Sequence, residues 1–548
     1  MVSLDPITGV LGRKAAAHFL RRVTFGASKQ QIDTFAGYSI DQAVSAVLVE
    51  SNIPSPPKDK KTGATWLNPK PGLSNSGEED LRDFFKSWVL ESMAKSGSNA
   101  VEKLTFFLHT HFTTIQSVVD QSSALYYQYL LLKKYTFGNL KELAEKICKD
   151  NAMLILLDGS LNVSGRPNEN FAREFFELYT IGRGKEIGAG NYTNYTESDI
   201  REAARVLSGW AYDSNYTTID ASTGVPSGKL KLNSSKLADK HDPGVKTFSS
   251  AFQNKSIAPS ALSGSYATEA AATKEITELV EMIFAQPETA RFFCRKLYRF
   301  YIFYKISEEV EENIIKPLAE NLVANNFQIK PLVEKLFKSK HFFDQDNTEV
   351  NDNARGALIK SPLDISIGML KFFKVEMPSD ANLTNYYGAY GELLSSLRDQ
   401  GMDYYEPLDV AGYDAYHEAP NYNRNWISAN FLARRYEFAA LAIKGIGMDG
   451  QPPLFKIDVM KYITDPVNVP NPSDATQLAK DVIELLLPEA ITEERFNYFL
   501  NILLDNLSTI NWEHEWENYI SSKNDMGIRT QLEDFFNAVL QSPEYQLL

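Results

Sequence analysis

The sequence has little cysteine and no long apolar run, and both absences narrow the class of protein. Cys148 and Cys294 are the only cysteines among 548 residues, so a disulfide framework is excluded and at most one bond could form. No stretch approaches the roughly eighteen consecutive apolar residues of a membrane-spanning helix. The first twenty residues contain neither a basic region nor a long apolar segment. We therefore expect no membrane span and no signal peptide, which on its own favours a cytoplasmic location.

An excess of basic charge is also missing. The chain has 56 Lys and Arg residues against 70 Asp and Glu residues, a net charge of −14. A protein that binds nucleic acid without regard to sequence needs a basic face that displaces counterions, so we expect no nucleic-acid partner. HExxH and CxxC metal motifs, a GxSxG elbow, a Walker loop and a GxGxxG turn are absent as well. These absences argue against a structural zinc site, a serine hydrolase, a nucleoside triphosphatase and a dinucleotide-binding enzyme.

The sequence does contain many signals for the starts of helices. Capping-box spacings, in which side chains satisfy the unpaired N–H groups of a first helical turn, occur at Ser28 with Gln31, Ser39 with Gln42, Ser76 with Glu79 and Thr196 with Asp199. Apolar residues recur at helical spacing over residues 81–92, 104–111, 116–135, 168–181, 197–210, 268–284, 288–304 and 426–443. With 43% apolar and 23% charged residues, the chain is typical of a soluble globular protein. We predict an all-α fold.

Two segments depart from the helical pattern. Residues 51–77, rich in Pro, Lys, Gly and Ser, indicate a mobile surface loop. Residues 212–266 carry many Ser, Thr, Asn and Gly residues and short alternating pieces, so we expect a small β-hairpin or an irregular insertion there. The predicted organisation is a helical region 1–210, an insertion 211–267 and a helical region 268–548 that shares one core with the first.

The densest polar stretch is DGSLNVSGRPNENFAREFFELYTIGRG at residues 158–184. Pro167 suits a first helical position, so we expect a helix from about residues 166–168. At 100° per residue, Asn170, Arg173, Glu174 and Glu177 point the same way. Glu174 and Glu177 could then act as acid and base or ligate a hard divalent metal ion, with Arg173 and Asn170 orienting them. The alternative is a solvated helical face with an ion pair between Arg173 and Glu177.

Three histidines are further candidates. His109 and His111 could share a metal ion on a strand or an irregular end, but on a helix they diverge by about 200° and could not. The alternative for both is a structural, buried histidine. His241 and Asp242 begin HDPGVK, where a loop could deliver His241 as a base or ligand to the helical carboxylates. Asp-Pro-Gly is equally good turn chemistry.

Arginines and aromatic residues supply candidate ligand contacts. Arg21 and Arg22 could bind an anion or clamp helix ends, and Trp210 ends a predicted helix. Arg291, Arg295 and Arg299 form a basic helical stripe that could meet an anion or pair with acidic helices. Between Met402 and Trp426 lie Tyr404, Tyr405, Tyr413, Tyr416 and Tyr422, interleaved with Asp409, Asp414, His417, Asn421 and Asn425. Tyr413 and Trp426 in such a setting suit stacking on sugar rings, or equally a packed surface loop.

Taken in order, several motifs resemble a known family. They are HFLRRVTFG, FLHTHFTT, the long stretch from DGSLNVSG to VLSGW, HDPGVKTF, FFCRKLYRFYI, and PLDVAGY followed by NRNWISANFLARR. Together they resemble the bacterial family of domains of unknown function numbered eighteen hundred. The resemblance implies no catalytic residues, but it implies genes often placed beside sulfatase-like proteins, and frequent export. Export to the periplasm is therefore the alternative location. Tyr413 stands where Trp is expected in many relatives.

These observations lead to two functional hypotheses. The first is a hydrolase or lyase acting on a glycan or another envelope polymer, with a carboxylate-centred site at Glu174 and Glu177. The second is a non-catalytic binding or maturation partner of a sulfatase-like protein, in which the basic stripe and the Tyr-rich segment form the interface. A purely structural, ion-paired helix is the remaining interpretation. No cofactor is specified, and a divalent metal ion stays open.

Overall fold

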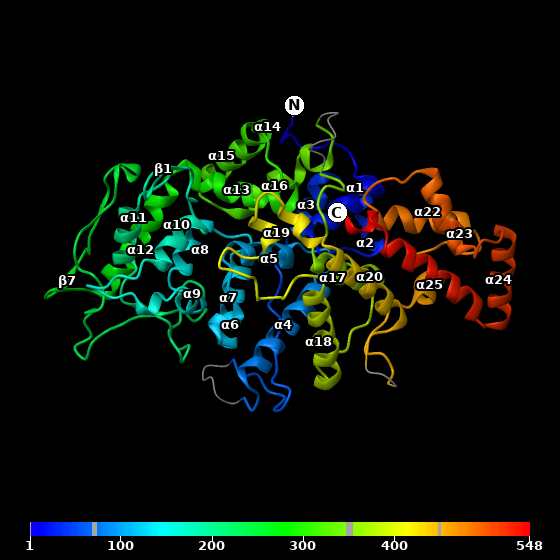
Figure 1. Ribbon diagram of the computed structural model, residues 1–548, viewed down its shortest axis with the longest axis horizontal. Coiled ribbons are helices and arrows are strands. Elements are labelled where there is room, and N and C mark those ends of the chain that lie inside the picture. The colour runs from blue at the N-terminus through cyan, green and yellow to red at the C-terminus, as the bar shows by residue number, and fades with distance from the viewer. Residues whose placement is uncertain (1, 68–73, 347–353, 448–450) are drawn as a thin grey trace.

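The computed structural model describes residues 2–67, 74–346, 354–447 and 451–548. Helices make up 54% of the chain and strands 6%, the latter in small two-stranded antiparallel sheets (Figure 1). The predicted helical fold class is confirmed. Within the described ranges, none of the helices combines the length and the hydropathy that a membrane crossing requires.

The helices of the first half of the chain precede the insertion. They are Gly12–Val23 (α1), Lys29–Ala36 (α2), Ile40–Val47 (α3), Glu78–Ala94 (α4), Val101–His111 (α5), Gln116–Val119 (α6), Ser122–Lys134 (α7), Leu140–Ile147 (α8), Asn151–Leu156 (α9), Asn170–Glu177 (α10) and Glu197–Val206 (α11).

The helices after the insertion form the second half. They are Glu269–Phe284 (α12), Pro287–Tyr301 (α13), Glu308–Val310 (α14), Lys316–Ala324 (α15), Ile329–Lys338 (α16), Pro362–Phe372 (α17), Leu383–Asp399 (α18), Asp414–His417 (α19), Ala429–Lys444 (α20), Val459–Thr464 (α21), Ala475–Leu486 (α22), Glu493–Leu503 (α23), Thr509–Ser522 (α24) and Met526–Leu540 (α25). Short 3₁₀ turns lie at Gly159–Leu161, Ser250–Phe252, His341–Phe343, Tyr422–Trp426 and Glu544–Gln546, and a π turn at Glu311–Ile315.

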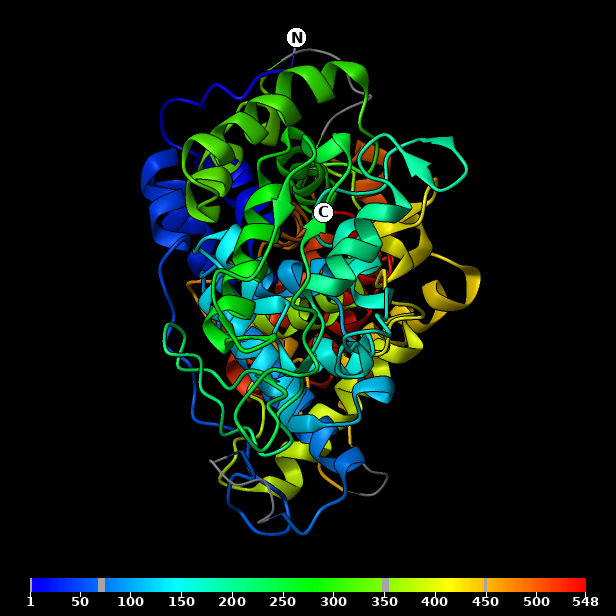
Figure 2. The same ribbon diagram turned by 90° about the vertical axis from the view of Figure 1, so that its left-hand side faces the viewer.

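The strands pair locally; the first pair precedes the predicted insertion 211–267, and the other three pairs lie within it or at its start. The pairs are Glu186–Gly188 (β1) with Asn191–Tyr192 (β2), Trp210–Ala211 (β3) with Lys229–Leu230 (β4), Lys246–Thr247 (β5) with Ser256–Ile257 (β6), and Leu262–Ser263 (β7) with Tyr266–Ala267 (β8). Figure 2 shows the long loops between these strands at the end of the molecule that faces the viewer, beside α8 and α12.

Helix starts follow the predicted capping chemistry in three of four cases. The boxes at Ser28, Ser39 and Thr196 form, each with the side chain three residues later bonded to the cap N–H. The box at Ser76 does not form, because the Ser76 hydroxyl donates to Asp59 Oδ1 at 2.7 Å and α4 starts from Gly77 instead. A long-range contact therefore overrides the local signal there.

The segment 51–77 is partly anchored. Buried Asp59 accepts hydrogen bonds from the hydroxyls of Ser74 and Ser76, and the Trp66 indole donates to Ser122 Oγ at 3.0 Å. Residues 68–73 of the predicted mobile loop lie outside the described residues. Trp66 and its neighbour Leu67 belong to the core rather than to solvent.

Buried side chains from all parts of the chain belong to one hydrophobic cluster, which reaches from Val2 to Tyr545. The first helix packs against α22, so segments far apart in sequence are joined. In Figure 1, α22 to α25 form one end of the long axis and α8 to α12 the other, while α5, α7 and the 402–426 segment lie between them.

Candidate functional site

Helix α10 carries the predicted carboxylates. It begins at Asn170, a few residues later than Pro167 indicated. Asn168 Oδ1 accepts a hydrogen bond from the Asn170 N–H at 2.9 Å, immediately before the helix. Phe171, Phe175 and Phe176 are buried and set the orientation of the helix. The opposite face carries exposed Asn170 and half-buried Arg173, Glu174 and Glu177.

Arg173 is held mainly by a residue that the sequence did not single out. Its two terminal nitrogens donate to both carboxylate oxygens of Glu197 on α11 at 2.7 Å, and one also reaches Glu169 at 3.3 Å. The expected partner Glu177 is 4.0 Å away. The hydrogen bonds to Glu197 raise the pKa of Arg173, and the same bonds lower the pKa of Glu197. Arg173 therefore fixes α10 on α11.

The two predicted carboxylates sit in different surroundings. Glu177 Oε1 accepts a hydrogen bond from the Tyr195 hydroxyl at 2.6 Å. Glu174 has no hydrogen-bond partner among the described residues, and burial is the main cause that raises its pKa. The negative charges of Glu177 and Asp409 raise it further, while Arg173 lowers it. Glu174 therefore holds a proton more readily than an exposed glutamate does.

The C-terminal end of α10 is anchored from α13. Lys296 Nζ donates to the Leu178 carbonyl at 2.9 Å, and its ammonium lies 5.1 Å from the centre of the Phe292 ring. Burial lowers the pKa of Lys296 to about 7, with Arg299 adding to the effect. This cation interacts favourably with the unpaired carbonyl groups of the helix end.

The Tyr-rich segment places a histidine beside two carboxylates, one of which, Asp409, acts electrostatically on Glu174 of α10. His417 Nε2 lies 3.2 Å from the Gly412 carbonyl, 3.8 Å from Asp409 Oδ1 and 3.9 Å from Asp414 Oδ1. Gly412 has φ of +108°, and a Cβ there would lie 2.9 Å from Thr113 Oγ1. Only glycine lets this loop approach the end of α5 so closely.

A cavity of about 280 Å³ opens beside this loop. Aromatic rings and carboxylates share its lining, together with one arginine and one asparagine: Tyr413, Trp426, Phe431, Asp403, Glu406, Asp414, Arg398 and Asn425. Tyr413 and Trp426 are buried, with ring centroids 6.3 Å apart. The Tyr413 hydroxyl donates to the Asp403 carbonyl and accepts the Tyr405 N–H at 2.8 Å, which fixes its ring as a wall.

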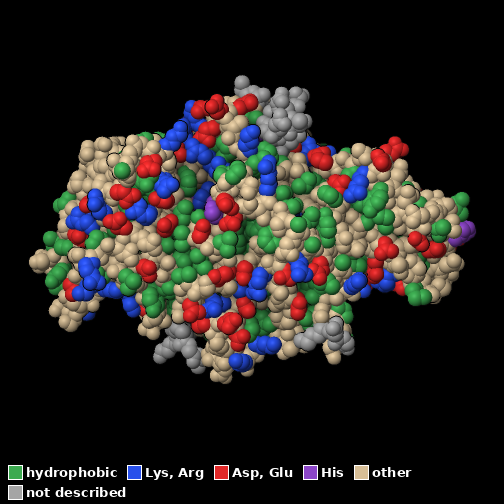
Figure 3. All heavy atoms as spheres, in the orientation of Figure 1, with side chains coloured by type: hydrophobic (Ala, Val, Ile, Leu, Met, Phe, Trp, Pro, Cys, Tyr) green, Lys and Arg blue, Asp and Glu red, His purple; other side chains and the backbone are tan. Residues whose placement is uncertain are grey.

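The views place the helix and the loop on one face. Segment 402–426 lies next to α10 in both Figure 1 and Figure 2. Figure 3 shows that the middle of this face is hollowed, with acidic side chains beside apolar ones. Asp409 of the loop raises the pKa of Glu174 on α10 through its negative charge, whereas the described residues that line the cavity include none from α10.

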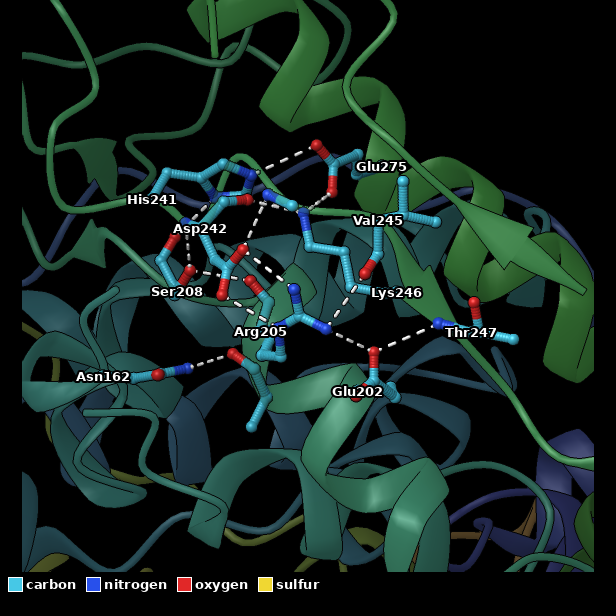
Figure 4. A network of polar contacts seen from close by, with 12 residues as sticks. Asn162, Glu202, Arg205, Ser208, His241, Asp242, Val245, Lys246, Thr247 and Glu275 are labelled. Atoms are coloured by element: carbon cyan, nitrogen blue, oxygen red, sulfur yellow. Dashed lines mark hydrogen bonds and ion pairs between the residues drawn. The ribbon is translucent and has the colours of Figure 1, made fainter. Parts of the chain in front are cut away.

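His241 and Asp242 lie in a separate, closed network, drawn in Figure 4. His241 is fully buried, with Nδ1 2.8 Å from the Ser208 carbonyl and Nε2 3.2 Å from Glu275 Oε1. Lys246 pairs with the other oxygen of Glu275. Both ring nitrogens are therefore occupied, and the expected delivery of His241 to Glu174 and Glu177 is not seen among the described contacts.

Asp242 is likewise committed to its own turn. Arg205 donates to both of its carboxylate oxygens at 2.9 and 3.1 Å, and the Gly244 N–H donates at 2.8 Å. Burial would raise the pKa of Asp242, but the bonds from Arg205 and Gly244 outweigh it and lower the pKa. The arrangement matches the turn interpretation of HDPGVK rather than the catalytic one.

His109 and His111 both lie on α5. As expected for two residues two positions apart on a helix, their rings diverge, so they do not share a metal ion. His111 Nε2 is 3.0 Å from the Tyr179 carbonyl, whereas His109 packs 4.2 Å from the Tyr405 ring, and both its nitrogens lack partners among the described residues. Burial lowers both pKa values, that of His109 to about 3. Within the described ranges, no group of three or more His, Cys, Asp or Glu residues is placed to hold a metal ion.

The remaining candidates hold the chain together. Arg22 is buried and donates to the carbonyls of Tyr301 and Ile302 at 3.0 and 3.2 Å, and Arg21 donates to the Leu485 carbonyl at 3.1 Å. Trp210 is buried in β3 under Lys149. These contacts fit clamping of helix ends. In the basic stripe, Arg295 pairs with Glu288 and Glu311.

Sequence reasoning missed Glu197, Tyr195 and Lys296, all of which contact α10 or the residue after it. The capping box at Thr196 placed Glu197 in a first helical turn, but nothing local indicated a partner on another helix. Tyr195 and Lys296 are likewise long-range partners, at separations of 18 and 118 residues.

Comparison with known proteins shows the family. Residues 18–547 match the family described as "Protein of unknown function (DUF1800)". The chain belongs to this family. No curated protein and no solved structure matches it.

Proposed function

We propose that this member of the DUF1800 family is a hydrolase or lyase acting on a glycan or a similar hydroxylated polymer, which binds in the cavity beside segment 402–426 and reaches towards α10. The observation that carries the proposal is the cavity lined by Tyr413, Trp426 and Phe431 together with Asp403, Glu406 and Asp414. Aromatic faces that alternate with carboxylates suit sugar rings, which present apolar C–H faces and polar hydroxyls.

The two carboxylates of α10 supply the acid–base pair. Glu174, with a raised pKa, is the proton donor to the leaving oxygen. Glu177, which accepts a hydrogen bond from the Tyr195 hydroxyl, is the base that activates water or removes a proton. Environments that differ between two carboxyls are the general way in which one enzyme assigns both roles. Arg173, held by Glu197, is a positioning residue that fixes the helix.

The test uses the full-length protein and a panel of neutral and acidic polysaccharides. New reducing ends report hydrolysis, and unsaturated products that absorb ultraviolet light report elimination. We expect release from at least one polymer, and Glu174→Gln should lower the rate on the order of 100-fold or more. Glu79→Gln, an exposed change on α4, should keep the rate of the parent protein. Full turnover in both Glu174→Gln and Glu177→Gln would rule out the assigned roles.

A second candidate is a binding or maturation partner of a sulfatase-like protein. It is favoured by a separate groove of about 700 Å³ between α12, α13 and α15, whose lining includes Phe284, Arg291, Val323 and Phe327. Val323 is 49% exposed there. Co-purification with such a protein supports this candidate, and Val323→Glu should abolish the complex without affecting polysaccharide cleavage.

A further inference from the structure

A second cavity, of about 400 Å³, lies apart from α10 and the 402–426 segment. It is bounded by residues 50–58, the second half of α4, the start of α5, the end of α7 and the start of α18. Its lining includes Trp88, Glu91, Glu102, Lys133, Tyr386 and Tyr387. Its size lies within the range of small-molecule sites, roughly 300 to 1,000 Å³.

The floor of this cavity is a buried polar cluster. Glu102 and Lys133 are 4% and 7% exposed, and Lys133 Nζ donates to Glu102 Oε1 at 2.6 Å. The Tyr129 hydroxyl donates to the other oxygen at 2.5 Å. Taking two charges out of water is costly, and such a pair more often weakens than strengthens a fold compared with apolar packing. Because Glu102 and Lys133 both line the cavity, a ligand there would meet this pair.

The floor keeps unused hydrogen-bonding capacity. A carboxylate offers about four lone-pair positions and an ammonium three protons. Each oxygen of Glu102 has one partner, and Lys133 has one acceptor among the described residues. A group that both donates and accepts, such as a hydroxyl, can therefore bridge Glu102 and Lys133 without breaking their contact.

The walls combine aromatic rings with a second carboxylate. The Tyr386 hydroxyl donates to Glu91 Oε2 at 2.8 Å, and Lys95 pairs with the other oxygen of Glu91. The Trp88 indole donates to the Ser55 carbonyl at 2.8 Å, which holds the proline-rich loop as the opposite wall.

Six of the seven charged side chains that line the cavity are paired within the protein; the seventh, Glu50, is exposed and has no ion pair among the described residues. Lys58 pairs with Asp380 at 2.6 Å, in addition to the pairs made by Glu91 and Glu102. A charged group that binds at any of these three pairs would have to displace one of its partners. A neutral ligand with hydroxyls along its edge and an apolar face against Trp88 and Tyr386 would displace none.

We infer that this cavity is a binding site for a neutral saccharide unit, separate from the proposed catalytic site. The inference does not depend on the roles of Glu174 and Glu177, because the two sites share no residue. A ring hydroxyl pair bonds to Glu102 and Lys133, a second hydroxyl bonds to Glu91, and the ring face packs on Trp88.

The test is calorimetric titration of the full-length protein with neutral hexasaccharides of glucose, mannose and N-acetylglucosamine. We expect at least one to bind. Glu91→Gln and Tyr386→Phe should each weaken that binding about tenfold or more, with unchanged circular dichroism. Glu79→Gln on the same helix is the matched control. Hydrogen exchange should slow in residues 50–58 and 88–102 on addition of the saccharide.

Three results would overturn the inference. One is the absence of binding for every hexasaccharide. Another is binding that survives both Glu91→Gln and Tyr386→Phe. A third is binding that Glu174→Gln abolishes while Glu91→Gln leaves it intact, because the sugar would then bind at the proposed catalytic site. Loss of polysaccharide cleavage in Glu174→Gln with hexasaccharide binding unchanged separates the two proposals.

Discussion

Arg173 on α10 and Glu197 on α11 form a bidentate pair, with both hydrogen bonds 2.7 Å long. The planar guanidinium matches the carboxylate fork, which gives this pair more geometric specificity than a single-contact ion pair. It fixes the helix that carries Glu174 and Glu177 against the first turn of its neighbour. The ion pair that the spacing of the sequence suggested, between Arg173 and Glu177, is the weaker contact at 4.0 Å.

Loss of this pair should be measurable but moderate. Both side chains are about one third exposed, so solvent screening limits the contribution of the pair. We expect Arg173→Ala to lower the free energy of unfolding by about 1 kcal/mol. Arg434→Ala, which removes the exposed Arg434–Glu437 pair, should leave the free energy of unfolding almost unchanged, because solvent screens exposed charges. Urea denaturation of the two variants checks the difference, and equal losses would contradict it.

Replacing Glu174 should stabilise the fold at neutral pH. A carboxyl whose pKa is raised on folding costs free energy once it ionises, so stability falls as pH rises from the unfolded pKa, about 4.3, through the folded value. Glu174→Gln removes that cost, and its gain should vanish in acid below about pH 4. Urea denaturation from pH 4 to 8 measures it, with Glu79→Gln as the control. A gain that does not depend on pH would show that ionisation is not the cause.

The buried network around Glu275 should be far more sensitive. Glu275 is 1% exposed and neutralises Lys246 while contacting His241. Removing one partner of a buried pair leaves an uncompensated charge, so Glu275→Gln should cost on the order of 3 to 5 kcal/mol. Glu269→Gln, exposed on the same helix, should be nearly neutral.

A double-mutant cycle separates the pair from the packing around it. The combination of Glu275→Gln with Lys246→Met should lower the free energy of unfolding by less than the sum of the two single changes. The reason is that Lys246→Met removes the charge that Glu275→Gln leaves without a partner. Additive losses in thermal or urea unfolding would indicate that Glu275 and Lys246 act independently.

Local signals in the sequence predicted local structure well. The boxes at Ser28, Ser39 and Thr196 form because each needs only residues within one helical turn. The box at Ser76 fails because Asp59, seventeen residues away, takes the hydroxyl. Similarly, the run 116–135 divides into α6 and α7 at Asp120, which has φ of +46°.

The candidate site could be predicted only in part, for the same reason. Periodicity placed Glu174 and Glu177 on one face of α10, and composition marked Tyr413 and Trp426 as aromatic ligand candidates. Neither property reveals that the two segments are neighbours, since that depends on contacts between residues more than two hundred positions apart. His241 shows the limit most clearly: its turn chemistry was visible, but its partner Glu275 was not.

Gly412 tests whether the Tyr-rich segment must approach α5. Its φ of +108° and the 2.9 Å that would separate an added Cβ from Thr113 Oγ1 both oppose a side chain. We expect Gly412→Ala to lower stability by about 1 to 3 kcal/mol and to weaken polysaccharide cleavage. Gly391→Ala is the matched control, because a Cβ in that helical position meets open space and alanine favours helix by about 0.5 to 1 kcal/mol. Thermal unfolding should move in opposite directions for the two variants.

His109 should make the fold sensitive to acid. Its ring is 2% exposed, has no hydrogen-bond partner among the described residues, and has its pKa lowered by burial from 6.5 to about 3. The unfolded chain therefore binds a proton at higher pH than the folded one, so stability is lost as pH falls from about 6.5 towards 3. Across that range the loss is on the order of 4 kcal/mol.

His109→Phe should flatten the acid limb of the stability curve, because phenylalanine fills the space beside Tyr405 without a titrating group. His514→Phe, at a side chain that is 72% exposed, should leave the limb unchanged. Urea denaturation from pH 4 to 7 measures both, and an acid limb of equal slope in the parent protein and His109→Phe would assign the sensitivity to other groups.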